Sequence, residues 1–478
     1  MLKNMIFAIF IIISLSLTFV FSYAANNSDP YEFKDKIKAD PTIVLNSNVD
    51  DLIAQYMLEG HILSLEASLV FKDKIIWTKG YGEQSKDNIV YKIGSINKCF
   101  TATALLQLCE QGKFELDDDV NKFLPFSLRN PYYPNKSITF RLLLLHQSSL
   151  LRGGDFYYSH VLNDLEQQLG VSNESLQAYP DWLDDVFLSY PSNDSEVWGT
   201  WAPGEKKYQL AYSNLGYDLL GYLIEIISNQ SIDKFFQNNI FEPLNMTNTH
   251  YTYQSYSPDR LATPHEWIPE GISFIYPLRP GDYPNGSDRN HHLPIFNLDS
   301  RGAGALRSTT TDLANFLIAH MNNGVYGANR ILSESSINLM HNESQVFYGN
   351  KIYDSYGFGW MNEKLNTLEI DGKHVTHFLQ GHGGRVFGFN SLMFFNQDIN
   401  IGVILFVNQG NNFYEDNSLD NSLWSIFNLL YKEGIYFRDA SISSSIDISG
   451  FEFLIVVLTV IFYISYIRIF RKKSKILI

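Results

Sequence analysis

Two positions in the chain have the spacing Ser-x-x-Lys, which can place a hydroxyl and an amine side by side. They are Ser95 with Lys98 and Ser231 with Lys234. Residues three apart lie on the same face of a helix, close enough for the amine to reach the hydroxyl and activate a serine nucleophile. Because roughly two such matches are expected by chance in a chain of this length, the surrounding elements have to distinguish them.

The residues around Ser95 predict a β-hairpin and then a long apolar helix. Two β-rich runs, 65–71 and 75–81, are separated by three polar residues, which is typical of a hairpin. Residues 91–94 lead into Ser95, and the apolar pattern that follows stops at Gln111-Gly112. Ser95 is therefore expected at the N-terminus of a helix.

The rest of the chain predicts a helical block and a late return of strands. Residues 117–322 are mostly helical with long loops, and 258–299 is a possible lid or binding loop. Strands are predicted at 374–380, 388–396 and 400–408, with turns at 381–384 and 396–398, before a final helix at 419–431. Pairing of the early hairpin with the late strands gives an α+β fold, with one antiparallel sheet flanked by helices and a large helical insertion.

Two further motifs follow the serine in order, Tyr212-Ser213-Asn214 and His382-Gly383-Gly384. Together with Ser95-x-x-Lys98 they resemble the serine β-lactamase and penicillin-binding-protein superfamily, most nearly the class C β-lactamase-related branch of esterases and D-aminopeptidases. The resemblance covers about residues 52–430, with further landmarks at 112–125, 138–150, 241–246 and 356–360. It implies a β-lactamase/transpeptidase-like fold, and it makes Ser231 the cap of a short helix at 232–236.

The resemblance implies that Ser95 is the catalytic nucleophile and that Lys98 and Tyr212 assist it. A free lysine would be only about 0.1% neutral near pH 7.4, so Lys98 must be perturbed by burial or share its proton with the nearby tyrosine. We therefore assign the pair, and neither member alone, as the general base. Asn214 is expected to hydrogen-bond Lys98 or the substrate amide.

The third motif implies a substrate-binding strand. The backbone N–H groups of Ser95 and Arg385 would form the oxyanion hole, and Gly383 and Gly384 would let the substrate lie against the strand edge. For the two glycines a plain β-turn is the alternative. His382 stands where β-lactamases and transpeptidases carry lysine, so recognition of a substrate carboxylate is expected to be weaker unless Arg385 substitutes.

Other histidines are given structural interpretations. His146 is expected to be structural and not catalytic. His265, His291 and His292 could suggest a metal site, but their spacing fits no strong one, and a solvent-exposed loop is expected instead. No metal and no cofactor are predicted.

Both ends of the chain predict segments outside the catalytic domain at 40–436. Residues 1–24 have the n-region, h-region and small-x-small pattern of a signal peptide, with an uncleaved signal anchor as the alternative. Residues 437–449 predict a Ser-rich linker, 450–470 a transmembrane helix and 471–478 a basic cytoplasmic tail. For the apolar segment a buried core helix is the alternative. These segments predict a single-pass type I membrane protein, anchored by its C-terminal helix, with the catalytic domain extracellular or lumenal.

Composition narrows the possible partners. The net charge of -15 is spread along 478 residues without a long basic patch, which argues against nucleic acid as a partner. Cys99 and Cys109 would stand about 15 Å apart on one helix, too far for a disulfide. Eight glycosylation sequons fit an extracytoplasmic protein if the host glycosylates; they begin at Asn26, Asn135, Asn173, Asn193, Asn229, Asn245, Asn285 and Asn342.

These observations predict a membrane-anchored, extracytoplasmic serine hydrolase that forms an acyl-enzyme on Ser95. Its substrate is expected to be a small molecule or peptide with an ester or amide bond, and a true β-lactamase is the less favoured reading. A catalytically inactive β-lactamase-like ectodomain with a binding or assembly role is the alternative.

Overall fold

The computed structural model describes residues 45–83, 86, 88–151, 161–168, 197–205, 211–268, 290–342, 345–346, 355–370, 372–410 and 417–445. Contacts divide the chain into Met1–Ile43 and Val44–Ile478, and every described residue lies in the second part. The predicted signal peptide (1–24), transmembrane helix (450–470) and basic tail (471–478) lie outside the described residues.

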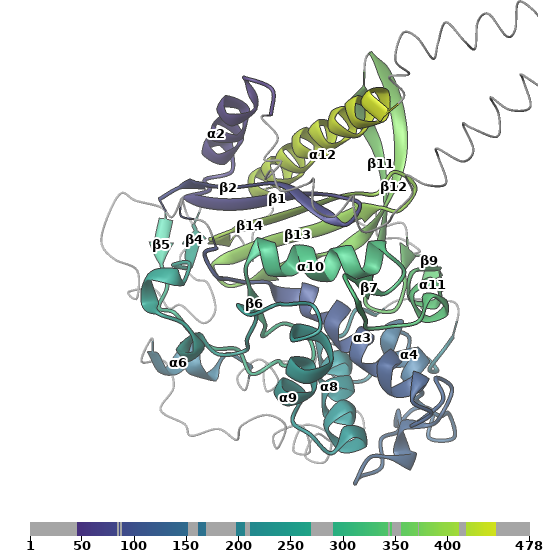
Figure 1. Ribbon diagram of the computed structural model, residues 1–478. Helices are drawn as coiled ribbons and strands as arrows, with labels where there is room; N and C mark the ends of the chain where they lie inside the picture. Colours follow the sequence, from purple (N-terminus) through teal and green to yellow (C-terminus); the bar gives the residue numbers. More distant parts are fainter. Residues whose placement is uncertain are drawn as a thin grey trace, which may run out of the picture. The chain divides into compact units, whose positions relative to one another are not determined.

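One antiparallel sheet organises the domain, and it is built from both ends of the sequence (Figure 1). Its order is β2-β1-β14-β13-β12-β11-β10-β9. The strands are β1 (Ser64–Phe71), β2 (Lys74–Gly82), β9 (Gln345–Val346), β10 (Ser355–Tyr356), β11 (Met361–Ile370), β12 (Lys373–Val386), β13 (Phe389–Asn396) and β14 (Ile401–Val407). The early hairpin pairs with the late strands through β1 and β14, with Leu65 opposite Val407, which confirms the predicted α+β architecture.

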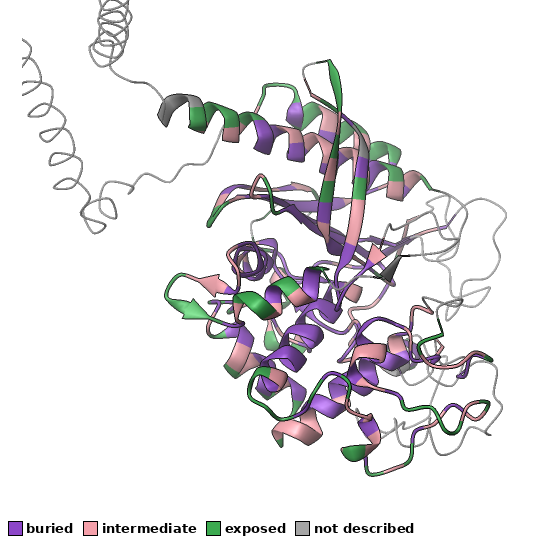
Figure 2. Cartoon of the chain, turned by 90° about the vertical axis from the view of Figure 1, so that its right-hand side faces the viewer, coloured by how far each residue is buried: buried purple, intermediate pink, exposed green. Residues whose placement is uncertain are grey.

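Helices cover both faces of this sheet. Helices α2 (Val49–Glu59) and α12 (Ser418–Ser445) lie on one face, and α10 (Thr310–Met321) lies on the other with the helical block beneath it (Figure 1). Every residue of β14 is buried, as are all but the last of β1, because these central strands are covered on both sides. Buried residues concentrate where the sheet meets the helical block (Figure 2).

The helical block is built around α3 (Asn97–Glu110), whose residues from Asn97 to Leu108 are all buried. Phe100 stacks on Phe316 of α10 with ring centroids 3.9 Å apart. Cys99 and Cys109, both on α3, are unpaired. Helices α8 (Asn214–Ser228) and α9 (Ile232–Phe236) pack against it, and α4 (Phe140–Leu144) packs against α8.

Short elements complete the described structure. The short helices are η1 (Gly94–Ile96), η2 (Val120–Lys122), α6 (Asn163–Gln168), η4 (Gln237–Phe241), η5 (Tyr253–Ser255), η6 (Pro258–Arg260) and α11 (Glu334–Asn342). The short strands pair as β3 (Tyr91–Lys92) with β6 (Arg307–Ser308), as β7 (Val325–Tyr326) with β8 (Asn329–Arg330), and as β4 (His265–Trp267) between β5 (Asn290–His292) and β15 (Gln409–Gly410).

The predicted turn at 381–384 is wrong, because β12 continues through these residues to Val386. Gly381 and Gly384 there serve close backbone approach, and the segment does not reverse the chain. At the C-terminal side, the final helix extends past the predicted end at 431, so that α12 also covers residues 437–445 of the predicted linker.

The prediction of a C-terminal membrane anchor, and with it single-pass type I topology, is corrected by the structure. Within the ranges that the structure describes, no helix combines the length and the apolar character that a membrane span requires.

Candidate active site

The segment that leads into Ser95 depends on a glycine with a positive φ angle. Gly94 has φ +51°, and a Cβ atom there would lie 2.8 Å from the backbone nitrogen of Arg385. Without a side chain, Gly94 can lie directly against β12. Ser95 follows in η1, which continues into α3. This confirms the predicted position of Ser95 at the start of the helix.

Lys98 lies one turn further along, with its ammonium group fully buried. Its Nζ donates to Ser95 Oγ at 3.0 Å, to Asn214 Oδ1 at 2.8 Å and to the backbone oxygen of Ala303 at 2.8 Å. Burial disfavours the charged form and lowers the pKa of Lys98 to about 7, while the negative charge of Asp218 acts in the opposite direction. The amine is therefore close to half neutral near pH 7.

The second motif reaches Lys98 because it starts helix α8. Ser213 caps the helix by accepting a hydrogen bond from the backbone N–H of Gly216 at 2.9 Å. The cap places Asn214 on the first turn and Tyr212 just before it. The ring centroid of Tyr212 lies 4.8 Å from Lys98 Nζ, so the structure brings together Ser95, Lys98, Tyr212 and Asn214.

His146 supports this arrangement through contacts with Ser213 and with the ring of Tyr212. Its Nδ1 accepts a hydrogen bond from the backbone N–H of Ser213 at 3.1 Å, and its ring lies 4.4 Å from that of Tyr212. Burial, together with the nearby charge of Lys98, lowers the pKa of His146 well below its usual value. These contacts fit the structural role that we expected for His146.

Strand β12 approaches the segment that leads into Ser95 through Gly384. A Cβ atom on Gly384 would lie only 1.9 Å from the backbone oxygen of Ile93, whereas one on Gly383 would find no atom nearer than 3.5 Å. Ser391 on β13 also donates to the Ile93 oxygen, at 3.0 Å. The backbone nitrogen of Arg385 is thereby brought next to Gly94, beside Ser95.

The side chains of His382 and Arg385 contact partners other than Ser95 and Lys98. His382 is fully buried, with Nδ1 2.5 Å from the backbone oxygen of Gly383 and Nε2 3.2 Å from the hydroxyl of Tyr356. Burial is the main cause that lowers the pKa of His382 to about 3, so the imidazole is neutral. The guanidinium of Arg385 binds Asn390 and pairs with Asp420 of α12.

A short loop at residues 300–303, here called the lysine loop, was not singled out from the sequence. Its Ala303 oxygen accepts from Lys98, and its Gly302 packs so tightly that a Cβ atom would lie 2.0 Å from the backbone oxygen of Tyr217. A backbone oxygen carries no residue type that a motif could reveal. The signal that could have been read is Asp218, an acidic residue that lies between the apolar residues Tyr217 and Leu219 in helix α8.

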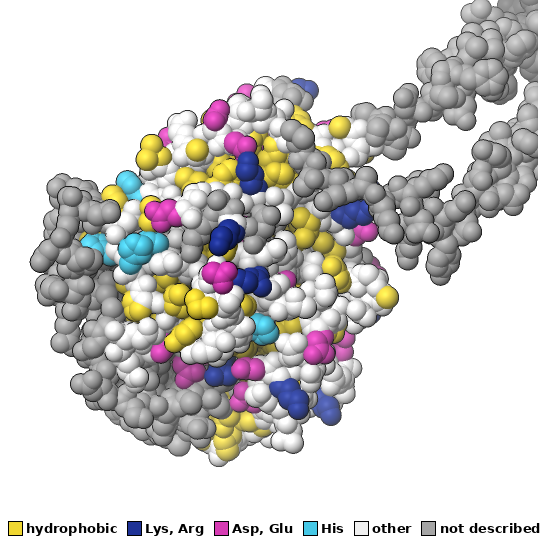
Figure 3. All heavy atoms as spheres, turned by 60° about the vertical axis from the view of Figure 1, so that its left-hand side comes forward, with side chains coloured by type: hydrophobic (Ala, Val, Ile, Leu, Met, Phe, Trp, Pro, Cys, Tyr) yellow, Lys and Arg dark blue, Asp and Glu magenta, His cyan; other side chains and the backbone are white. Residues whose placement is uncertain are grey.

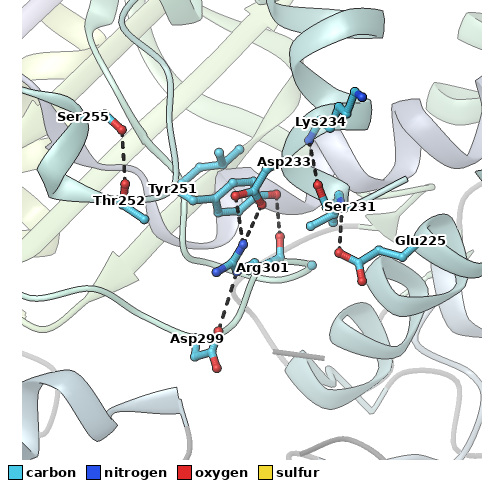
Figure 4. Close-up of polar contacts among 12 residues, drawn as sticks. Glu225, Ser231, Asp233, Lys234, Tyr251, Thr252, Ser255, Asp299 and Arg301 are labelled. Carbon is cyan, nitrogen blue, oxygen red and sulfur yellow. Dashed lines mark hydrogen bonds and ion pairs between the residues drawn. The ribbon is translucent and has the colours of Figure 1, made fainter. Parts of the chain in front are cut away.

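The second Ser-x-x-Lys match is a helix cap, as predicted. Ser231 Oγ accepts from the backbone N–H of Lys234 at 3.4 Å, and the N–H of Ile232 donates to Glu225 at 2.8 Å (Figure 4). Ser231 is thus committed to the start of α9, and it borders a wide surface pocket of about 330 Å³ that includes Asp233 and Tyr251.

The solvent-exposed loop expected for His265, His291 and His292 is wrong, because these residues lie in β4 and β5 and His265 is buried. His265 pairs with His292 in register, with ring centroids 4.1 Å apart, and histidines gather on one flank of the molecule in Figure 3. No group of three potential ligands that could hold a metal ion occurs in the portion of the chain that the structure covers. Charged side chains of both signs are mixed over the face shown in Figure 3.

Comparisons with known proteins agree with the geometry. The chain is 26% identical over 368 residues to Protein flp of Staphylococcus aureus (strain MRSA252), covering 75% of this chain and 62% of that protein. It is 28% identical over 383 residues to Beta-lactamase-like protein 2 of Dictyostelium discoideum, covering 75% and 61%. It therefore spans about three fifths of the length of these relatives.

A solved structure shares the fold. D-amino acid amidase from Ochrobactrum anthropi SV3, complexed with L-phenylalanine amide, superposes with a TM-score of 0.63 at 20% identity, covering 83% of this chain and 100% of the amidase. The fold and the serine–lysine arrangement are those of the serine β-lactamase and penicillin-binding-protein superfamily. The chain belongs to the Beta-lactamase family, whose model matches residues 49–422.

Proposed function

We propose that the protein is a hydrolase that is acylated on Ser95 and cleaves an amide, ester or peptide bond. The observation that carries this proposal is the 3.0 Å contact between Lys98 Nζ and Ser95 Oγ, in an environment that lowers the pKa of Lys98 to about 7. A neutral amine at this distance can accept the serine proton as the hydroxyl attacks. The ring of Tyr212 lies beside Lys98 Nζ, and we infer that its hydroxyl shares that proton with the amine.

The remaining groups would act on the substrate. The backbone N–H groups of Ser95 and Arg385 would stabilise the oxyanion that forms when Oγ attacks the carbonyl carbon, an interaction worth about 3 kcal/mol for each donor. The Lys98–Tyr212 pair would return the proton to the leaving amine or alcohol. Water, activated by the same pair, would then hydrolyse the ester on Ser95 and release the acid.

We infer that the preferred substrate carries no carboxylate beside the scissile bond. A substrate carboxylate needs a cation to compensate for its loss of hydration. His382 is neutral, and the guanidinium of Arg385 already pairs with Asp420. An uncharged amide or ester therefore suits this strand better than a penicillin, and the amide complex of the similar amidase supports the amide class.

Activity-based labelling of the purified protein tests the proposal. A fluorescent fluorophosphonate should label the wild type and the Ser231→Ala variant equally, because Ser231 only caps α9. The Ser95→Ala variant should not be labelled, and Tyr212→Phe should be labelled at least tenfold more slowly. A fluorescent penicillin should react much more slowly than the fluorophosphonate.

Two outcomes would contradict the proposal. Equal labelling of wild type and Ser95→Ala would exclude Ser95 as the nucleophile. No labelling of the folded wild type by either probe would favour a non-catalytic binding protein. Faster labelling by the penicillin would remove only the inference about the carboxylate.

A further inference from the structure

Asp218 is a buried carboxylate one turn along α8 from Asn214, and it has no place in the chemistry described above. Its side chain is 0% exposed. One carboxylate oxygen accepts from the hydroxyl of Ser300 at 2.8 Å, and the other accepts from the backbone N–H of Gly302 at 2.9 Å. Burying a carboxylate is costly unless hydrogen bonds and a nearby cation compensate for it, so its position calls for a reason.

Both hydrogen bonds of Asp218 hold the lysine loop. The same loop presents the Ala303 oxygen to Lys98 Nζ at 2.8 Å. Thr101 of α3 fixes it from another side by donating to the Gly302 oxygen at 2.6 Å. Asp218 therefore helps to determine where one of the three acceptors of Lys98 lies.

Asp218 also supplies negative charge to a site that is otherwise poor in it. Titratable groups from several elements surround Lys98: the Cys99 thiol beside it on α3, the phenols of Tyr212 and Tyr217, and the imidazoles of His146 and His382. Burial keeps Cys99 and Tyr217 protonated and keeps both imidazoles neutral. Asp218 adds a carboxylate to these surroundings, and its negative charge favours the ammonium form of Lys98.

We propose that Asp218 is the positioning residue of the general base: its charge and its hold on the lysine loop keep Lys98 basic enough to take the Ser95 proton at neutral pH. The inference rests on the proposed function of Lys98. A lysine buried without a counter-charge becomes too weak a base, because its ammonium form is no longer stabilised. A general base works best when its pKa lies near the working pH.

The chain offers a matched control at Asp233, which holds the same loop from outside. Asp233 accepts from Arg301 of the lysine loop at 2.8 and 2.9 Å, and Arg301 also approaches Asp299 (Figure 4). The Asp233 side chain is 42% exposed and paired with Arg301, so solvent and its partner screen its charge. An Asp233→Asn substitution loosens the loop and leaves the buried charge of Asp218 in place.

The test measures the rate of fluorophosphonate labelling of Ser95 between pH 5 and 9 in the full chain. Labelling should rise with pH as Lys98 loses its proton, with a midpoint near 7 in the wild type. In Asp218→Asn the midpoint should move to lower pH by about one unit or more, because loss of a nearby negative charge disfavours the ammonium form. In Asp233→Asn the midpoint should stay at the wild-type value.

An unchanged midpoint in folded Asp218→Asn, or an equal shift in both variants, overturns the inference. If Asp218→Asn does not fold, Asp218→Ser provides a second neutral variant whose hydroxyl can still accept from Gly302. If neither folds, the wild-type profile decides, because a midpoint below pH 5 shows that no counter-charge acts on Lys98. A wild type that is unlabelled at every pH refutes the proposed function itself, which distinguishes the two failures.

Discussion

At the scale of single residues, the two glycines of the third motif differ in how closely other atoms approach them. Gly384 lies against the backbone oxygen of Ile93, so that any side chain would collide with the segment leading into Ser95. A Cβ atom on Gly383 would have no neighbour nearer than 3.5 Å, where it would make ordinary van der Waals contact with Leu392. The protein itself therefore requires only the second glycine, and any requirement for the first must come from the substrate.

Alanine substitutions separate these two requirements. Gly384→Ala should lower the free energy of unfolding by about 2 kcal/mol, because it forces β12 away from the segment that leads into Ser95, and it should slow labelling of Ser95 at least tenfold. Gly383→Ala should leave the free energy of unfolding within about 0.5 kcal/mol of wild type. Urea unfolding and fluorophosphonate labelling measure both effects, and equal stability of the two variants would contradict this account.

Residue types with a chemical signature were the part of the site that could be predicted. Ser95, Lys98, Tyr212 and Asn214 are brought within one cluster, as their motifs indicated. The Ala303 oxygen was missed because any residue can supply a backbone acceptor. The partner of Arg385 was missed because Asp420 lies on a helix whose placement depends on the whole sheet.

At the scale of elements, α3 is a helix without an exposed face over most of its length. It lies within the helical block, packed against α8, α9 and η4, and its burial leaves no amphipathic pattern in the sequence. Its apolar run predicted the helix but not its neighbours. Phe100 shows what fixes it there: its ring stacks on Phe316 at 3.9 Å and meets Phe241 edge-on at 6.0 Å.

Removing the Phe100 ring should loosen the packing of α3, the helix that carries Lys98. Phe100→Ala should lower the free energy of unfolding by about 3–5 kcal/mol, the usual cost of emptying a phenylalanine site in a packed core. Leu58→Ala on α2, where the side chain is 78% exposed, should change it by less than about 0.5 kcal/mol. Urea denaturation of both variants is the measurement, and a loss below 1 kcal/mol in Phe100→Ala would contradict the central position of α3.

The length of one late strand, β12, could not be predicted from the sequence. The strand expected at 374–380 runs from Lys373 to Val386, because Gly381 to Gly384 pair with β13 residue by residue. Glycine-rich runs usually signal turns, and only tertiary contact with Ile93 reveals the other use of glycine here. The pairing of the early hairpin with the late strands was predicted correctly, whereas β9, β10 and β11 of the same sheet were not predicted.

At the scale of the whole molecule, four buried histidines make folding sensitive to acid. Burial lowers the pKa values of His146, His320, His341 and His382, in the last two to about 3. The unfolded chain, with histidine pKa values near 6.5, therefore binds more protons than the folded chain below that pH. The stability that neutral burial provides is complete above pH 6.5 and is lost as the pH falls towards 3.

Between pH 6.5 and 5.5, each of these histidines should remove about 1 kcal/mol from the free energy of unfolding. Urea denaturation at the two pH values measures the sum. His341→Leu should reduce the pH-dependent loss by one histidine's share, whereas His374→Leu, at an exposed position of β12, should leave it unchanged. A free energy of unfolding that is equal at both pH values would refute this account.

The pairing of β1 with β14 also affects how the nascent chain folds during synthesis. Leu65 leaves the ribosome long before Val407, its partner in the sheet, and the backbone of Arg385 reaches Gly94 equally late. At about 5–20 residues per second, this delay lasts on the order of 15–70 seconds. For that interval β1 has an open edge and the segment that leads into Ser95 lacks its supporting strand, so the candidate site can form only after β12, β13 and β14 have left the ribosome.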